Sequence, residues 1–204
     1  MIVYVESNFI LELAYQQEEH ESCGHILTAA QQGGITLALP AFCLGETYES
    51  WVRRSRERRA LHEQLTRELK QLARSQTYNT LLRDSSAVTR ALISSGEEEK
   101  QRLDRVIISM TDVAAIIPLA RETIQQAIPL QASRSLSPQD AIVYSSILAH
   151  MSSAPGQPKC FLTRNSRDFA NPDVEQDLQR HDCKLLTKFI NGLDYIRGRM
   201  EPHT

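Results

Sequence analysis

Short apolar runs alternate with segments of helical periodicity along this chain, and this alternation restricts the fold more than any other feature of the sequence. The runs with strand character are residues 2–5, 35–39, 114–119, 160–163 and 183–186. Parallel strands cannot be joined by tight turns, so strands separated by helical segments form a mostly parallel sheet. Crossover helices cover both faces of such a sheet. The sequence therefore predicts an α/β fold with helices on both faces.

The first strand delivers a carboxylate at its carboxyl end. The run Ile2–Val5 leads directly to Glu6, and the next two residues, Ser7 and Asn8, are of types that cap helices. An amphipathic segment, Phe9–Ala14, continues from there. Ligands of open α/β sheets bind just beyond the carboxyl ends of the strands, so Glu6 lies where chemistry is expected. Taken alone, the stretch still favours the simpler interpretation, a surface glutamate in an ordinary strand-to-helix turn.

Two further acids follow the same layout. Pro40 ends the second run, and the helical segment after it carries Glu46 in its first or second turn. Ser137 and Pro138 have the residue types of a helix N-cap and a first helical position, which puts Asp140 in the first turn of that helix. A carboxylate is favoured at that point by the partial positive charge of the helix start.

A fourth polar group follows the strand at residues 160–163, where Asn165 and Asp168 occur. The carboxyl ends of parallel strands share one edge of the sheet, so we expect these polar groups to meet there. The expected cluster consists of Glu6, Glu46, Asp140, Asn165 and Asp168. Glu49 lies on the same helical face as Glu46 and is an alternative to it.

Several carboxylates in one small site repel one another unless a cation lies between them. Mg²⁺ and similar hard divalent ions take oxygen ligands and are usually held by few carboxylates plus substrate phosphates. Such ions support in-line displacement at phosphorus, so the cluster indicates phosphodiester hydrolysis. The sequence contains neither a glycine-rich phosphate loop nor a G-x-S-x-G motif, which argues against nucleoside triphosphatases and serine hydrolases.

The residue composition and the hydrophobic periodicity of the chain change between about residues 51 and 110, where we expect an inserted helical hairpin. Leucines at helical spacing mark an apolar stripe, and breaks are expected at residues 75–79 and 94–96, with the last helix beginning at Glu97. The segment opens with five arginines, Arg53, Arg54, Arg56, Arg58 and Arg59. These arginines could bind RNA phosphates, but a charged run on a long helix is more often a solvated face.

Composition fits this interpretation without deciding the function. The 204 residues suit one domain, and no apolar run approaches the roughly 20 residues that cross a bilayer. Four scattered cysteines without a C-x-x-C pair indicate free thiols in a reducing compartment, and we expect a cytoplasmic protein. His20, Cys23 and His25 could suggest zinc, but a second ligand pair at finger spacing is missing, so a polar helix is the better interpretation.

Four segments of the sequence resemble the motifs of PIN-domain nucleases, in the order of that family. They are V-Y-V-E-S-N at the start, L-P-x-F-x-x-x-E ending at Glu46, S-P-Q-D-A-I with Asp140, and F-L-T-R-N-S-R-D-F at 161–169. The resemblance spans residues 1 to about 195 and implies a three-layer α/β/α sandwich. It also implies a single PIN-like domain over residues 1–204, with the helical insertion at about 51–110, that cleaves RNA with Mg²⁺ or Mn²⁺.

The resemblance also assigns roles to residues. It implies that Glu6, Glu46, Asp140 and Asp168 are catalytic and that these four and Asn165 hold the metal. Ser7, Asn8 and Thr163 would support these ligands rather than contact the ion. Many small bacterial members of the family are toxins paired with an antitoxin, and many are dimers. An antitoxin or another protein partner, and a homodimer, are therefore further expectations, whereas no membrane association is expected.

Two departures from the family pattern bear on activity. The first acid of the family is normally aspartate, whereas this chain has Glu6. One extra methylene moves a carboxylate by about 1 Å, and a misplacement of that size can cost about 100-fold in rate. The insertion also makes the chain longer than the compact toxins. The alternative function is therefore a catalytically degenerate PIN-fold scaffold that binds RNA or a protein.

Overall fold

A parallel sheet forms the centre of the computed structural model, which describes residues 1–79 and 85–200. Within these residues its strands are β1 (Ile2–Val5), β2 (Thr36–Pro40), β3 (Ala115–Ile117), β4 (Lys159–Leu162) and β5 (Cys183–Leu186). Their order is β3-β2-β1-β4-β5, and every neighbouring pair is parallel. The predicted parallel α/β sheet is confirmed.

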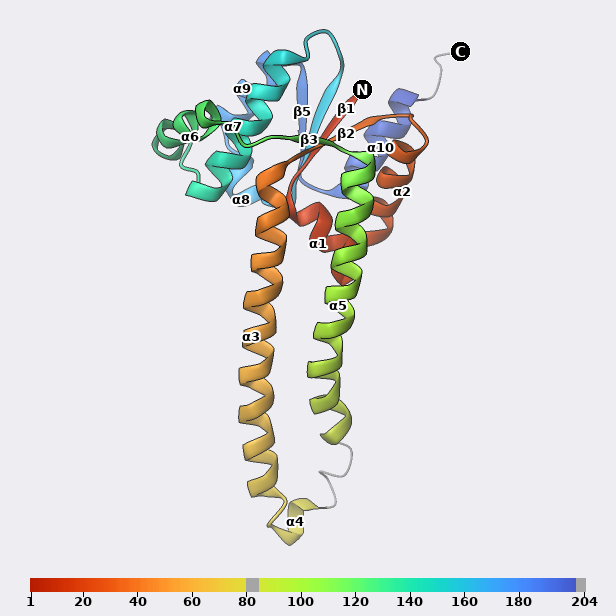
Figure 1. Ribbon diagram of the computed structural model, residues 1–204, viewed down its shortest axis with the longest axis vertical. Helices are drawn as coiled ribbons and strands as arrows, with labels where there is room; N and C mark the ends of the chain where they lie inside the picture. Colours follow the sequence, from red (N-terminus) through yellow and green to blue (C-terminus); the bar gives the residue numbers. More distant parts are fainter. Residues whose placement is uncertain (80–84, 201–204) are drawn as a thin grey trace.

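Helices connect the strands and cover both faces of the sheet (Figure 1). Figure 1 shows α1, α2 and α10 on one side of the sheet and α6, α7 and α9 on the other, which gives three layers. The helices in the described residues are α1 (Ser7–Tyr15), α2 (His20–Gln31), α3 (Ala41–Leu72), α4 (Gln76–Asn79), α5 (Ser85–Val113), α6 (Arg121–Ser133), α7 (Pro138–Ser153), α8 (Ser166–Phe169), α9 (Pro172–Arg180) and α10 (Phe189–Met200). In the described part of the chain, none of them combines the length and apolarity needed to cross a membrane.

The core is centred on β1, whose four residues are all buried. Val3 pairs with Leu37 of β2 and Cys160 of β4, and all three side chains are inaccessible to solvent. A parallel strand covered on both faces has no polar side, which explains why its sequence is a continuous apolar run rather than an alternating one. The four cysteines, all in described residues, are free and buried.

The turn from β1 into α1 differs in detail from the prediction. Ser7 and Asn8 were the expected capping residues, but Glu6 itself is the N-cap, and its side chain accepts a hydrogen bond from the backbone N of Asn8. Glu6 has an extended backbone, which lets its carboxylate reach forward to the free N–H groups of the first helical turn. At α7 the prediction is confirmed, because Ser137 is the N-cap and accepts a hydrogen bond from Asp140 N.

Two long helices, α3 and α5, run side by side away from the sheet (Figure 1). The expected break at residues 94–96 is wrong, because α5 continues through Gly96. Glycine destabilises a helix interior by about 1 kcal/mol relative to alanine. Here, contacts with α3 stabilise the helical turn that contains Gly96. Trp51 donates its indole N–H to the carbonyl of Gly96 at 3.1 Å, and Arg58 binds both Ser95 and Glu99.

The structure also shows two helices on the other face of the sheet. Helix α6 runs from Arg121 to Ser133 and contains Pro129. Helix α9 was missed, although its sequence carries a start signal. Asn171 is its N-cap and accepts a hydrogen bond from Val174 N, and Pro172 is its first residue.

Candidate active site

Three of the predicted carboxylates and Asn165 line one cleft at the carboxyl edge of the sheet. Glu6 comes from the end of β1, Glu46 from the second turn of α3, Asp140 from the first turn of α7, and Asn165 from the loop after β4. The cleft has a volume of about 320 Å³. Its lining also includes Ser7, Asn8, Leu11, Glu49, Ser50, Arg53, Ser137, Gln139 and Val143.

Glu6 is buried, with 7% of its surface exposed. One carboxylate oxygen accepts a hydrogen bond from Thr163 Oγ1 and the other from Asn8 N, each at 3.0 Å. Burial, with a smaller contribution from the nearby charge of Glu46, raises the pKa of Glu6 to about 7. The two hydrogen bonds oppose this shift because they stabilise the ionised form.

The other two carboxylates are half-buried, and each accepts a hydrogen bond from a serine hydroxyl. Ser7 Oγ donates to Glu46, and Ser137 Oγ donates to Asp140. Burial is the main cause that raises the pKa of both acids. The charge of Asp140 adds to the shift at Glu46. The three acids therefore share a site in which their full ionisation is unfavourable.

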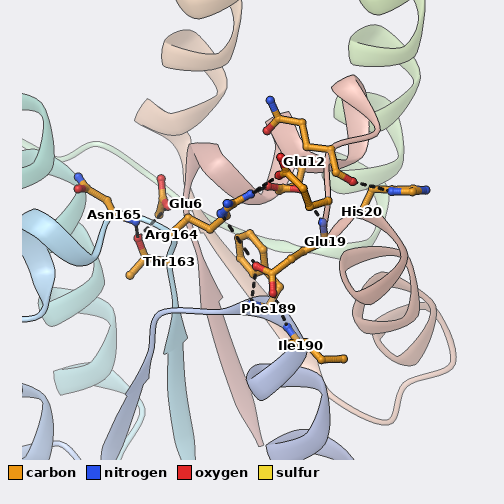
Figure 2. Close-up of polar contacts among 11 residues, drawn as sticks. Glu6, Glu12, Glu19, His20, Thr163, Arg164, Asn165, Phe189 and Ile190 are labelled. Carbon is orange, nitrogen blue, oxygen red and sulfur yellow. Dashed lines mark hydrogen bonds and ion pairs between the residues drawn. The ribbon is translucent and has the colours of Figure 1, made fainter.

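Thr163 and Asn165 connect two of these acids through hydrogen bonds. Thr163 Oγ1 donates to Glu6 and accepts from Asn165 N at 2.9 Å. The side-chain amide of Asn165 donates to Asp140 at 3.1 Å. Figure 2 shows Glu6, Thr163 and Asn165 side by side at the carboxyl end of β4. The loop after β4 thus fixes the orientation of carboxylates that come from β1 and α7.

Asp168 and Glu49 occupy different places relative to this cleft. Asp168 lies in α8 and is absent from the cleft lining among the described residues. Its negative charge nevertheless contributes to the raised pKa of Asp140. Glu49 is exposed and lines the cleft, so it remains a possible substitute for Glu46.

The five arginines that were weighed as RNA contacts against a solvated helix face have different surroundings in the structure. Arg53 is the one basic side chain, among the residues described, that lines the cleft. Arg54 lies over the ring of Tyr15, 4.5 Å from its centre. Arg58 forms two hydrogen bonds of 2.8 Å with Glu99, so its guanidinium already has a partner. The remaining two, Arg56 and Arg59, are exposed.

One polar cluster beside the cleft had no predicted role. Glu12 of α1 is only 1% exposed and forms an ion pair with Arg164 (Figure 2). A signal was available, because Glu12 lies among the apolar residues of a helix that packs on the sheet, and a buried carboxylate requires a cation or several hydrogen bonds. The sequence does not indicate which basic residue supplies the charge.

The donor set fits a hard divalent cation in its chemistry. Glu6, Glu46, Asp140 and Asn165 offer oxygen atoms, and a cation would offset the burial and the weaker mutual repulsion that raise the pKa values of the acids. Among the described residues, no group of three or more His, Cys, Asp or Glu side chains is arranged so that it could hold a metal ion. Mg²⁺ is commonly bound by only one or two carboxylates together with water and substrate phosphates.

The match to one protein family agrees with this description. A family model described as PIN domain matches residues 3–169. The crystal structure of VapBC2 from Rickettsia felis, bound to a DNA fragment from its promoter, is similar with a TM-score of 0.44 and 13% sequence identity. The similarity covers 91% of this chain and 98% of that chain. The curated proteins contain no significant match.

Proposed function

The chain belongs to the PIN-domain family, and from this premise we propose that it is a metal-dependent endoribonuclease. The observation that carries the proposal is the convergence of Glu6, Glu46 and Asp140 on one cleft, each with a raised pKa. Groups with perturbed pKa values in a cleft are typical of catalytic sites. Nucleases of this family generally use divalent metals, which matches the oxygen-rich lining.

In the proposed reaction, one or two of the carboxylates of Glu6, Glu46 and Asp140 would hold Mg²⁺ or Mn²⁺ together with water and the substrate phosphate, and Asn165 would complete the pocket. The bound ion would supply Lewis-acid chemistry, by acidifying water and neutralising charge on the phosphate. Ser7 and Ser137 keep the acids oriented through their hydrogen bonds to Glu46 and Asp140. Asp168 adds negative charge near Asp140 and so favours a cation there.

Arg53 is the proposed contact to the RNA backbone. It lines the cleft together with the acids, and a guanidinium can bind phosphate oxygens. The other four arginines are weaker candidates, since Arg54 and Arg58 already contact Tyr15 and Glu99. RNA binding through Arg53 should weaken as salt concentration rises.

The test is an RNA cleavage assay with purified protein in Mn²⁺, in Mg²⁺ and in a chelator. We expect cleavage that requires the metal and that falls by about 100-fold or more in Asp140→Asn. Asp173→Asn is the matched control, because Asp173 is also in the first turn of a helix, α9, but is exposed and outside the cleft. Absence of cleavage, or equal activity of Asp140→Asn and the wild type, would contradict the proposal.

A second candidate is a PIN-fold scaffold that binds RNA or protein without catalysis. It is favoured by one observation: both oxygens of Glu6 already accept hydrogen bonds within the chain. Calorimetric titration with Mn²⁺ separates the two candidates. Binding that is lost in Asp140→Asn supports the nuclease, whereas no heat of binding up to millimolar Mn²⁺ supports the scaffold.

An antitoxin as protein partner is a separate proposal that rests on the family alone. Its test is coexpression with the product of a small neighbouring gene, followed by copurification. An inhibitory complex would support it, and a neighbouring product that neither binds nor inhibits would contradict it.

A further inference from the structure

Arg164 lies between the two residues that orient the acids of the cleft. Thr163 Oγ1 binds Glu6, and the side-chain amide of Asn165 binds Asp140. The three residues are consecutive in the loop after β4. Any displacement of the Arg164 backbone would therefore move both hydrogen bonds at once.

The side chain of Arg164 extends away from the cleft acids toward α1 (Figure 2). Its guanidinium pairs with Glu12, whose side chain is 1% exposed, and with Glu18 at 3.0 Å. Glu18 is 80% exposed, so its pair is weakened by solvent. Glu12 is the strong partner, since a buried carboxylate without a cation is costly.

The carboxylate of Glu12 is held in place by further hydrogen bonds. Its second carboxylate oxygen accepts a hydrogen bond from Glu19 N at 3.1 Å. The carboxylate of Glu19 accepts hydrogen bonds from the backbone N of Phe189 and of Ile190, both at 3.2 Å. These two residues begin α10, so the network joins α1, α10 and the loop after β4 (Figure 2).

We propose that Arg164 is a positioning residue for the carboxylates of the cleft, an inference that rests on the proposed nuclease function. Its ion pair with buried Glu12 fixes the position of the Thr163–Asn165 loop. In that position Thr163 can bind Glu6 and Asn165 can bind Asp140. Direct binding of RNA phosphate by Arg164 is disfavoured by its surroundings. Its guanidinium pairs with two acids, and its Nε lies 4.0 Å from a third, Glu19.

The test uses Arg164→Met, Glu12→Gln and the double variant, each compared with the wild type. Arg164→Met leaves Glu12 buried and unpaired, so both its thermal stability and its kcat should fall. In the double variant the buried charge is also gone, so the melting temperature should return toward the wild-type value. Because the loop is still not anchored, kcat should stay about 10- to 100-fold below wild type, with KM changed less than about threefold.

Two further measurements separate positioning from a general structural role. Mn²⁺ titration by calorimetry should show binding that is weaker by about tenfold in the double variant than in the wild type. Arg164→Lys keeps the charge and should recover part of kcat. Glu18→Gln is the matched control, because it removes the exposed partner of the same arginine, and it should leave kcat and Mn²⁺ affinity unchanged.

The outcomes distinguish this inference from the proposed function. Recovery of kcat together with stability in the double variant would show that Arg164 only compensates a buried charge, and would overturn the inference. So would wild-type kcat in Arg164→Met. Wild-type protein that neither cleaves RNA nor binds Mn²⁺ would overturn the nuclease proposal and this inference with it. Low kcat and weak Mn²⁺ binding in a stable double variant would support the positioning role of Arg164.

Discussion

At the scale of single residues, Glu6 combines two tasks that oppose each other. Its carboxylate accepts hydrogen bonds from Asn8 N at the start of α1 and from Thr163, and these bonds favour the ionised form. The same carboxylate is buried beside Glu46, which disfavours the ionised form. The same environment that suits a cation penalises the charge when the cation is absent. Without metal, this position should therefore destabilise the fold at high pH.

The first prediction follows from the pKa of Glu6, which is about 7 in the folded protein and near 4.5 ordinarily. Between these pH values the folded state keeps a proton that the unfolded state loses. The free energy of unfolding therefore falls as pH rises from about 4.5 to about 7, and it levels off above the pKa of the folded state. In chelator, the wild type should lose about 3 kcal/mol of unfolding free energy from this group between pH 4 and pH 8. Glu6→Gln should remove most of this pH dependence.

Urea unfolding of both proteins in chelator at several pH values measures this effect. Glu46 and Asp140 shift in the same direction and leave a smaller residual slope in Glu6→Gln. Asp173→Asn serves as the control and should keep the wild-type pH profile. A metal-free wild type that is more stable at pH 8 than at pH 5 would show that Glu6 is not strained by its charge.

Sequence reasoning could foresee which acids meet but not how they are held. Glu6, Glu46 and Asp140 each follow a strand or start a helix, and the parallel topology then brings them to one edge. The pairing of Arg164 with Glu12 depends on the directions of two side chains that are 152 positions apart in the sequence. Periodicity carries no information on such a pair, which is why it was missed.

At the scale of elements, one of the five arginines, Arg58, stabilises the packing of α3 against α5. Arg58 and Glu99 have side chains that are 18% and 8% exposed, and their bidentate contact joins the two helices. Breaking a buried ion pair leaves an uncompensated charge. This same set of contacts explains why α5 crosses Gly96 without the predicted break.

The second prediction compares Arg58→Met with Arg59→Met. Arg58→Met should lower the unfolding free energy by about 2–4 kcal/mol, because Glu99 remains buried without its partner. Arg59 is exposed, and its replacement should change stability by less than about 0.5 kcal/mol. Chemical denaturation of both variants measures the difference. Equal stability of the two variants would mean that the Arg58–Glu99 pair contributes nothing to the helix pair.

Helix α10 packs against β4 at a glycine. A Cβ atom on Gly192 would lie 2.7 Å from Leu162 Cδ2 and 2.9 Å from Leu162 Cδ1, well inside van der Waals contact. Leu162 is fully buried and precedes Thr163, so it has little room to move. The close approach of α10 therefore depends on the missing side chain.

The third prediction is that Gly192→Ala destabilises the protein by about 1–3 kcal/mol through overpacking. Gly198→Ala, in the same helix, is the control, because a Cβ there meets no atom within 4 Å. That control should be neutral or stabilising by up to about 1 kcal/mol, since alanine favours helices. Thermal unfolding of the two variants tests the difference in sign.

At the scale of the whole molecule, strand order places the cleft. From β1 the chain builds β2 and β3 on one side and β4 and β5 on the other, so the order reverses next to β1. Crevices at such a reversal are where open α/β sheets bind ligands. The alternating pattern predicted the parallel sheet, but the order of its strands could not be read from periodicity, which describes each strand alone.

Metal binding at this crevice gives the last prediction. An ion that binds only the folded state stabilises it by about 2.7 kcal/mol at 100 times its Kd, which raises the melting temperature of a domain of this size by about 5–10 °C. Protons compete for the same carboxylates, so the shift with Mn²⁺ should be larger at pH 8 than at pH 5.

Differential scanning calorimetry with and without Mn²⁺ at both pH values measures this shift. Asp140→Asn should lose most of it, while Asp173→Asn, altered at an exposed helix start, should keep it. A shift of equal size at both pH values, or in both variants, would place the ion outside the acidic cleft. No shift at either pH would favour the scaffold over the nuclease, because the acids would then be held by hydrogen bonds alone.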